Sequence, residues 1–214
     1  MIVVFSGIDS SGKTTQIALF ENYCAKKGYN VRKIWGKGRG TPGVLLIKDI
    51  FRPDKHLSED GKKEYRKKVY GSRKKKVLLL IASILDLYWY FGIYYRLLNL
   101  THKILICDRY IWDTYIDFRS EFPEFDIDKW WIWMFALLLV PKSKHSFMFF
   151  ISAEESYARD IAKGDKTLDP LDIKRVKVER YMNLINKNKW EVVIDGMQDR
   201  QTIFKTVISK VFPK

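Results

Sequence analysis

Two glycines, a lysine and a threonine near the start of the chain have the spacing of a phosphate-binding loop. They form the pattern Gly7-x-x-x-x-Gly12-Lys13-Thr14, which follows the apolar run from Ile2 to Phe5. Such a loop turns its backbone N–H groups toward phosphate oxygens, and glycine permits turns that a side chain would block. The lysine of this pattern reaches the β- and γ-phosphates, and the hydroxyl that follows it is placed to hold Mg²⁺. The pattern therefore predicts a site for ATP with magnesium.

A second polar group follows another apolar run, Lys103 to Cys107. Asp108 can hold the water shell of Mg²⁺, because this ion prefers oxygen ligands. Arg109 carries a planar guanidinium that suits a forked grip on phosphate. Phosphoryl transfer needs alignment and positive charge around the moving group more than covalent chemistry. We therefore predict Lys13, Asp108 and Arg109 as catalytic residues, and Thr14 and Asp108 as metal ligands.

The phosphate loop contains no arginine, so a further catalytic cation has to come from another segment. Arg159 is our candidate, with Lys163 and Lys166 close to it in the sequence, on a small lid around residues 159–170. An ordinary charge on an exposed helix is an equally good interpretation of Arg159. The loop itself supplies the predicted contacts to ATP, which are Gly7, Asp9, Ser10, Ser11, Gly12, Lys13, Thr14 and Thr15.

Strands and helices alternate along the chain and position these residues. The predicted strands are Ile2–Phe5, Val31–Trp35, Lys103–Cys107, Ser146–Ile151 and Trp190–Ile194. The predicted helices include Gln16–Lys27, Val44–Phe51, Val77–Leu98, Lys129–Val140, Ala153–Lys163, Leu171–Asn188 and Asp199–Val211. Strands separated by helices pair in parallel, which predicts an α/β fold of three layers, a five-stranded sheet with helices on both faces. Ligands bind beyond the carboxyl ends of such strands, where the polar groups lie.

Composition limits the remaining possibilities. A chain of 214 residues can bury a core, and we predict that residues 1–214 form a single domain. The two cysteines, Cys24 and Cys107, lie in core patterns, which favours a reducing compartment, and we expect a cytoplasmic protein without a signal peptide. The histidines have no metal-ligand spacing, and no nucleophile lies in a recognisable elbow, so a metalloprotein or a hydrolase is disfavoured.

The formal net charge is +14, and basic residues gather between Lys62 and Lys76. A run of this kind is usually a solvated face, and we give that interpretation more weight. It leaves open a weak association with an anionic membrane surface. Nucleic-acid binding stays open as part of the same alternative, although we expect no specific nucleic-acid partner.

The segment from Val77 to Leu98 is apolar nearly all round, which is typical of a buried or interface helix. Its length approaches that of a membrane span, but Asp86 and Arg96 favour the central helix of a soluble core. Large apolar side chains are also dense in a chain of 25.4 kDa. We therefore predict a homodimer that packs through Tyr88 to Leu98 and Trp130 to Leu139.

The sequence resembles the thymidylate kinase branch of the nucleoside monophosphate kinases. The resemblance rests on FSGIDSSGKTTQ at Phe5 to Gln16, ICDRY at Ile106 to Tyr110 and VVIDG at Val192 to Gly196. It implies the P-loop kinase fold with a five-stranded parallel sheet, ATP as phosphoryl donor, Mg²⁺ as cofactor, a mobile lid and helix-packed dimers.

The resemblance also implies roles for individual residues. Asp9 matches the acidic loop residue that touches the acceptor sugar, and Asp108 with Arg109 matches the pair that serves the Mg²⁺ and phosphate region. Tyr110 joins Arg109 in the substrate-binding set. Asp195 and Gly196 are expected beside the adenine of ATP.

The chain departs from the family pattern at two places. Thymidylate kinases usually grip the acceptor phosphate with Arg-Glu-Pro-Gly after the second strand, whereas this chain has Gly36-Lys37-Gly38-Arg39, so we assign Lys37 and Arg39 to the acceptor. Around Leu85 and Leu87 it lacks the arginine that helps to read the base. Thymidylate-kinase-like proteins of unsettled substrate share these features.

The sequence therefore predicts an enzyme that moves a phosphoryl group from ATP to a nucleoside monophosphate, most simply dTMP, with weak discrimination among pyrimidines. One alternative is a kinase of another small phosphorylated acceptor, such as a sugar or a lipid head group. Another is a basic nucleotide-binding protein that acts at a membrane or on nucleic acid.

Overall fold

The computed structural model describes residues 1–36, 72–164 and 169–213. The chain divides into two compact units. The first unit comprises Met1–Lys37, Leu97–Glu121 and Lys142–Lys214, and the second comprises Gly38–Arg96 and Phe122–Pro141. The single domain with a lid around 159–170 stays a prediction, and the expected helix Val44–Phe51 and most of the basic run from Lys62 lie outside the described residues.

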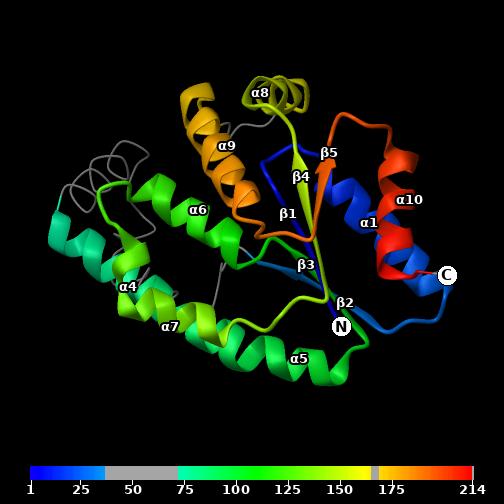
Figure 1. Ribbon diagram of the computed structural model, residues 1–214, viewed down its shortest axis with the longest axis horizontal. Helices are drawn as coiled ribbons and strands as arrows, with labels where there is room; N and C mark the ends of the chain where they lie inside the picture. Colours follow the sequence, from blue (N-terminus) through cyan, green and yellow to red (C-terminus); the bar gives the residue numbers. More distant parts are fainter. Residues whose placement is uncertain (37–71, 165–168, 214) are drawn as a thin grey trace, which may run out of the picture. The chain divides into compact units, whose positions relative to one another are not determined.

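The first unit contains the predicted five-stranded parallel sheet (Figure 1). The strands are β1 (Ile2–Gly7), β2 (Val31–Trp35), β3 (Ile104–Asp108), β4 (His145–Phe150) and β5 (Val192–Asp195), in the order β2-β3-β1-β4-β5. Central β1 is buried along its whole length, as its apolar sequence predicts. This is the α/β arrangement of a P-loop kinase fold, and the prediction of fold class is confirmed.

Helices cover both faces of this sheet. On one face lie α1 (Lys13–Lys26) and α10 (Arg200–Val211), which pack with Phe5, Phe147 and Phe149 of the strands. The opposite face carries α6 (Ile111–Glu121) and α9 (Leu171–Asn186), which bury Ile116 and Tyr181 around Met148. Helix α8 (Ala153–Ala162) follows β4, and the side chain of Ser152 caps its first turn.

The second unit is helical where it is described. Helix α4 (Arg73–Trp89) continues through the π-helical turn η1 (Tyr90–Tyr94) into α5 (Tyr95–Thr101), which leads the chain back to the first unit. A 3₁₀ turn, η2 (Ile127–Lys129), precedes α7 (Trp131–Leu139). Helix α7 packs against α4, because the Tyr88 hydroxyl donates to the carbonyl of Ile132 at 2.6 Å and the Tyr88 ring meets that of Phe135.

The long helix is less buried than its composition led us to expect. Only 22% of its most apolar 18-residue window, with a mean hydropathy of 1.8, is buried. Leu80, Ile84 and Leu87 are buried, whereas Leu78 and Trp89 are exposed. By length and composition alone Arg73–Thr101 could cross a membrane, a test that the core helix of a soluble protein also passes. The expectation of a largely buried core helix is therefore wrong, and the interface interpretation stays a prediction.

Candidate active site

The phosphate loop takes its predicted shape because two of its glycines adopt backbone angles that other residues avoid. Gly7 has φ of 140° and Gly12 has φ of 91°, both on the left-handed side. A Cβ atom at Gly7 would lie 2.3 Å from the carbonyl oxygen of Phe149 in the neighbouring strand. The turn at Gly12 leads directly into α1, so this helix begins at Lys13, three residues earlier than predicted.

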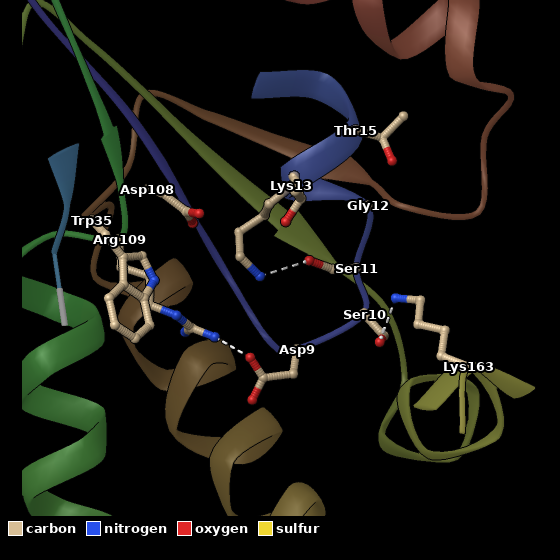
Figure 2. Close-up of a pocket in the computed structure, with 11 residues that line it drawn as sticks. Asp9, Ser10, Ser11, Gly12, Lys13, Thr15, Trp35, Asp108, Arg109 and Lys163 are labelled. Atoms are coloured by element: carbon tan, nitrogen blue, oxygen red, sulfur yellow. Dashed lines mark hydrogen bonds and ion pairs between the residues drawn. The ribbon is translucent and has the colours of Figure 1, made fainter. Parts of the chain in front are cut away.

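A pocket opens at the carboxyl ends of β1, β2 and β3 (Figure 2). The strand register brings these ends together, because Asp108 pairs with Phe5 on one side and with Trp35 on the other. The lining residues are Asp9, Ser10, Ser11, Gly12, Lys13, Thr14, Thr15, Trp35, Asp108, Arg109 and Lys163. The structure thus gathers the phosphate loop and the Asp-Arg pair in one place, where Ser10, Ser11, Gly12, Thr14 and Thr15 remain predicted ATP contacts.

Lys13 is buried in the loop that it follows. Its ammonium group donates hydrogen bonds to the carbonyls of Gly7 at 2.8 Å and Ile8 at 2.5 Å, and to the Ser11 hydroxyl at 3.2 Å. Burial, and then the nearby charge of Arg109, lower the pKa of Lys13 from its ordinary 10.5 to about 7. A phosphate group in the pocket would favour the charged form of this lysine.

Arg109 is held with its guanidinium against the phosphate loop. Its backbone has φ of 77°, an uncommon angle for a residue with a side chain. The guanidinium donates to the carbonyl of Gly7 at 3.1 Å and forms an ion pair with Asp9 (Figure 2). Burial alone would lower the pKa of Arg109, but Tyr181, Asp9 and Asp113 raise it above its ordinary value. This side chain is therefore a permanent cation beside the loop.

The predicted magnesium ligands both line the pocket. Thr14 offers a hydroxyl on the first turn of α1, and Asp108 offers a carboxylate at the end of β3. Among the residues that the structure describes, no three His, Cys, Asp or Glu side chains gather into a ready-made metal site. This sparse oxygen donor set fits Mg²⁺, which keeps several waters and binds through one or two carboxylates together with the phosphates of its nucleotide.

The two candidate cations of α8 have different surroundings. Arg159 donates to the carbonyls of Ser10 and Gly196, both at 3.3 Å, and pairs with Glu155 at 2.6 Å. Lys163 lines the pocket and donates to the Ser10 hydroxyl at 2.8 Å (Figure 2). Arg159 thus binds backbone carbonyls next to the phosphate loop, while Lys163, the residue that follows α8, faces the pocket.

Three further predicted residues, Asp195, Gly196 and Tyr110, do not line the pocket. Exposed Asp195 accepts a hydrogen bond from the backbone N–H of Met197 and so caps its own turn. Gly196 packs closely on the loop, because a Cβ atom there would lie 3.0 Å from the carbonyl oxygen of Ser11. The side chain of Tyr110 is buried. Lys37 and Arg39 lie outside the described residues.

Sequence reasoning missed several residues that contact the loop or the pocket. Trp35 ends β2 and contributes an indole to a mainly polar lining. Asp113, on the first turn of α6, is a buried acid three residues after Tyr110, and this position in a first helical turn is the one sequence signal that marks it. Buried Lys174 of α9 pairs with Asp160 of α8 at 2.5 Å, and no local pattern announces that pair.

Comparison with known proteins points in the same direction as the site. No family model matches the chain. The chain is 26% identical over 217 residues to the thymidylate kinases of Thermoanaerobacter sp. (strain X514) and Thermoanaerobacter pseudethanolicus, which covers 98% of this chain and 96% of each relative. A 54-residue stretch is 37% identical to a probable thymidylate kinase of Methanobrevibacter smithii, covering 25% of this chain and 28% of that protein. This chain is therefore a distant full-length relative of proteins named thymidylate kinase.

Proposed function

We propose that this protein is a kinase that transfers the γ-phosphoryl group of ATP to a nucleoside monophosphate, most simply dTMP, and releases ADP and the diphosphate. One observation carries the proposal: the phosphate loop, Lys13, Asp108 and Arg109 all line a single pocket at the carboxyl ends of the strands. The distant relatives named thymidylate kinase support the same reaction class.

The donor half of the reaction belongs to the phosphate loop. Its backbone N–H groups and the N-terminus of α1 stabilise the negative charge of the ATP phosphates. The ammonium group of Lys13 lies in the same loop and donates to the carbonyls of Gly7 and Ile8. When ATP binds, it would exchange these carbonyl partners for phosphate oxygens. Mg²⁺ bound with ATP, held by Thr14 and Asp108, would neutralise part of the phosphate charge. Lys163 adds a further positive charge at the rim of the loop.

The acceptor half is proposed on the side of Arg109. Its guanidinium can grip phosphate with two hydrogen bonds and keeps its charge at any working pH. Asp9, which is its partner, is 44% exposed and can accept a hydrogen bond from a sugar hydroxyl. Trp35 offers an aromatic face in the same lining, which suits a planar base. These three side chains support a nucleotide as the acceptor, and Lys37 and Arg39 stay predicted contacts to its phosphate.

A panel of acceptors tests the proposal. ATP consumption is measured at steady state with dTMP, dUMP, dCMP, purine monophosphates, a sugar phosphate and a phosphorylated lipid head group, with Lys13→Ala as the blank. We expect turnover with pyrimidine monophosphates and less than about tenfold selectivity in kcat/KM among them. Turnover only with the sugar phosphate or the lipid head group would show that the acceptor belongs to that class and is not a nucleoside monophosphate. No turnover with any acceptor would overturn the kinase proposal.

A further inference from the structure

A buried carboxylate joins the phosphate loop to two helices. The side chain of Asp113 is 1% exposed and accepts hydrogen bonds from the Ser6 hydroxyl at 2.6 Å and from the backbone N–H of Tyr110 at 2.8 Å. It also accepts from the backbone N–H of Gly7 at 3.2 Å and from the Tyr181 hydroxyl at 2.7 Å. Four donors therefore converge on one side chain, two from the end of β1, one from the residue before α6 and one from α9.

The same group holds one edge of the Arg109 guanidinium. The Nη1 atom donates to the carbonyl of Gly7 at 3.1 Å and to the Tyr181 hydroxyl oxygen at 3.3 Å, and it lies 3.6 Å from a carboxylate oxygen of Asp113. The other terminal nitrogen, Nη2, bonds to Asp9, whose side chain is partly open to solvent. The guanidinium thus has a buried edge with several protein partners and an outer edge with an accessible partner.

We propose that Asp113 and Tyr181 are positioning residues that fix the Nη1 edge of Arg109, so that its Nη2 edge can exchange Asp9 for a phosphate oxygen of the bound nucleotide. The inference deepens the proposed phosphoryl transfer and rests on it. It assigns a role to two residues that do not line the pocket themselves.

The hydrogen-bond directions support this role. Burial, and then the charge of Asp113, raise the pKa of Tyr181 well above its usual range, so its hydroxyl keeps its proton. That proton is donated to Asp113, which leaves the oxygen lone pairs for Arg109. A tyrosine oriented in this way selects one rotamer of the arginine. Fixing a long side chain in advance removes part of the entropy loss that would otherwise oppose its contact with phosphate.

Guanidinium rescue separates positioning from a general effect on folding. Arg109→Ala removes the side chain, and free guanidinium at millimolar concentration, far below denaturing levels, can enter the space that it leaves. With Asp113 present to hold the ion, we expect rescue of kcat by about tenfold or more. In the double variant Arg109→Ala/Asp113→Asn we expect no rescue. Equal rescue in both variants would overturn the role of Asp113.

Two variants complete the test. Tyr181→Phe removes one oxygen atom and serves if Asp113→Asn does not fold; we expect kcat to fall about tenfold while KM for ATP changes less than about threefold. Thr114→Val is the matched control, because among the described residues its hydroxyl bonds to the carbonyl of Tyr110, the residue just before α6, and we expect wild-type kinetics. Wild-type kcat for Tyr181→Phe would contradict the proposal.

A binding measurement keeps this inference distinct from the proposed function. MgATP and dTMP are titrated separately, so that no turnover occurs, into four proteins: the wild type, Arg109→Ala, Tyr181→Phe and the double variant Arg109→Ala/Tyr181→Phe. For at least one of the two nucleotides we expect the losses in affinity to be strongly non-additive, because the tyrosine acts only through the arginine. Additive losses for both nucleotides would overturn the positioning role even if the protein is a kinase. If the losses are non-additive but the protein transfers no phosphoryl group, the proposed kinase function is wrong, whereas the positioning role of Tyr181 toward Arg109 is supported.

Discussion

Lys13 is buried in the phosphate loop beside a second cation, and this environment changes its acidity. The pKa of its ammonium group is lowered to about 7, first by burial and then by Arg109. A bound triphosphate would reverse the second effect, because it brings negative charge to the same place. Binding of ATP should therefore draw a proton onto Lys13 at pH values above about 7.

The pH dependence of ATP affinity follows from this linkage. Below pH 7 the lysine is charged with or without ATP, so its contribution to affinity is fully present; above pH 7 it is lost as the free protein deprotonates. We expect MgATP affinity to fall by up to about tenfold per pH unit between pH 7 and 9. Calorimetry in buffers of different ionisation enthalpy should detect proton uptake at pH 8. Lys13→Arg stays charged and should lose this slope, whereas a pH-independent wild type would contradict the assignment.

At the scale of elements, the C-terminal end of helix α8 contacts the phosphate loop and also contains the first residues of the predicted lid. The sequence named Arg159 as the candidate cation, although its spacing from Lys163, four residues later at the end of this helix, puts both on one face and does not separate their roles. Their roles diverge because Arg159 meets carbonyls of Ser10 and Gly196, residues that are 149 and 37 positions away in the sequence. Such contacts depend on how β1, β4 and β5 pair, which no local pattern specifies.

Single alanine variants test this division of roles. We expect Lys163→Ala to weaken MgATP binding or lower kcat by about tenfold without changing the melting temperature, because it removes a charge at the pocket rim. Arg159→Ala should lower both the melting temperature and ATP affinity, since it frees two carbonyls that shape the loop. Exposed Lys187 provides the control variant, Lys187→Ala. A Lys163→Ala protein with wild-type affinity and kcat would remove this residue from the site.

For the molecule as a whole, the sequence predicted the five strands, their parallel pairing and the phosphate loop, because each depends on a local pattern or on strand-helix alternation. The catalytic candidates Lys13, Asp108 and Arg109 were found for the same reason. Asp113 and Tyr181 were missed because they lie 68 positions apart in the sequence and act as a pair only after α6 and α9 cover the same face of the sheet. Polar residues inside helices carry no mark of such pairing.

The apolar face of the second unit bears on assembly. Helices α4 and α7 run in the same direction, since Tyr88 meets Ile132 while Gly92 lies against Leu139. On α4 and η1, the residue after each contact residue is exposed, and on α7 the residue before each contact residue is exposed. One residue is a rotation of about 100° around a helix, so these opposite steps on two parallel, facing helices point their side chains to the same side. These side chains are Trp89, Ile93, Trp131 and Leu138. An exposed apolar face of this kind is typical of a protein interface.

We expect this face to pair with a second copy of the chain. Light scattering at micromolar concentration should give the mass of a dimer, and Trp89→Glu combined with Leu138→Glu should give a monomer. Met182→Glu, on an exposed position of α9, is the control and should leave the dimer intact. A strictly monomeric wild type would contradict the prediction, and if it also bound anionic vesicles in a salt-dependent way, the face would belong to a membrane surface.

Transfer of label from [γ-³²P]ATP to dTMP tests the central claim most directly. The wild type should produce labelled dTDP, and Lys13→Ala should lower the rate by about a hundredfold or more while its melting temperature stays close to that of the wild type. This loss is expected because, in the proposed reaction, Lys13 would stabilise charge on the moving phosphoryl group. Label that appears only as inorganic phosphate, or a Lys13→Ala rate near that of the wild type, would contradict the account of this pocket as a site of phosphoryl transfer.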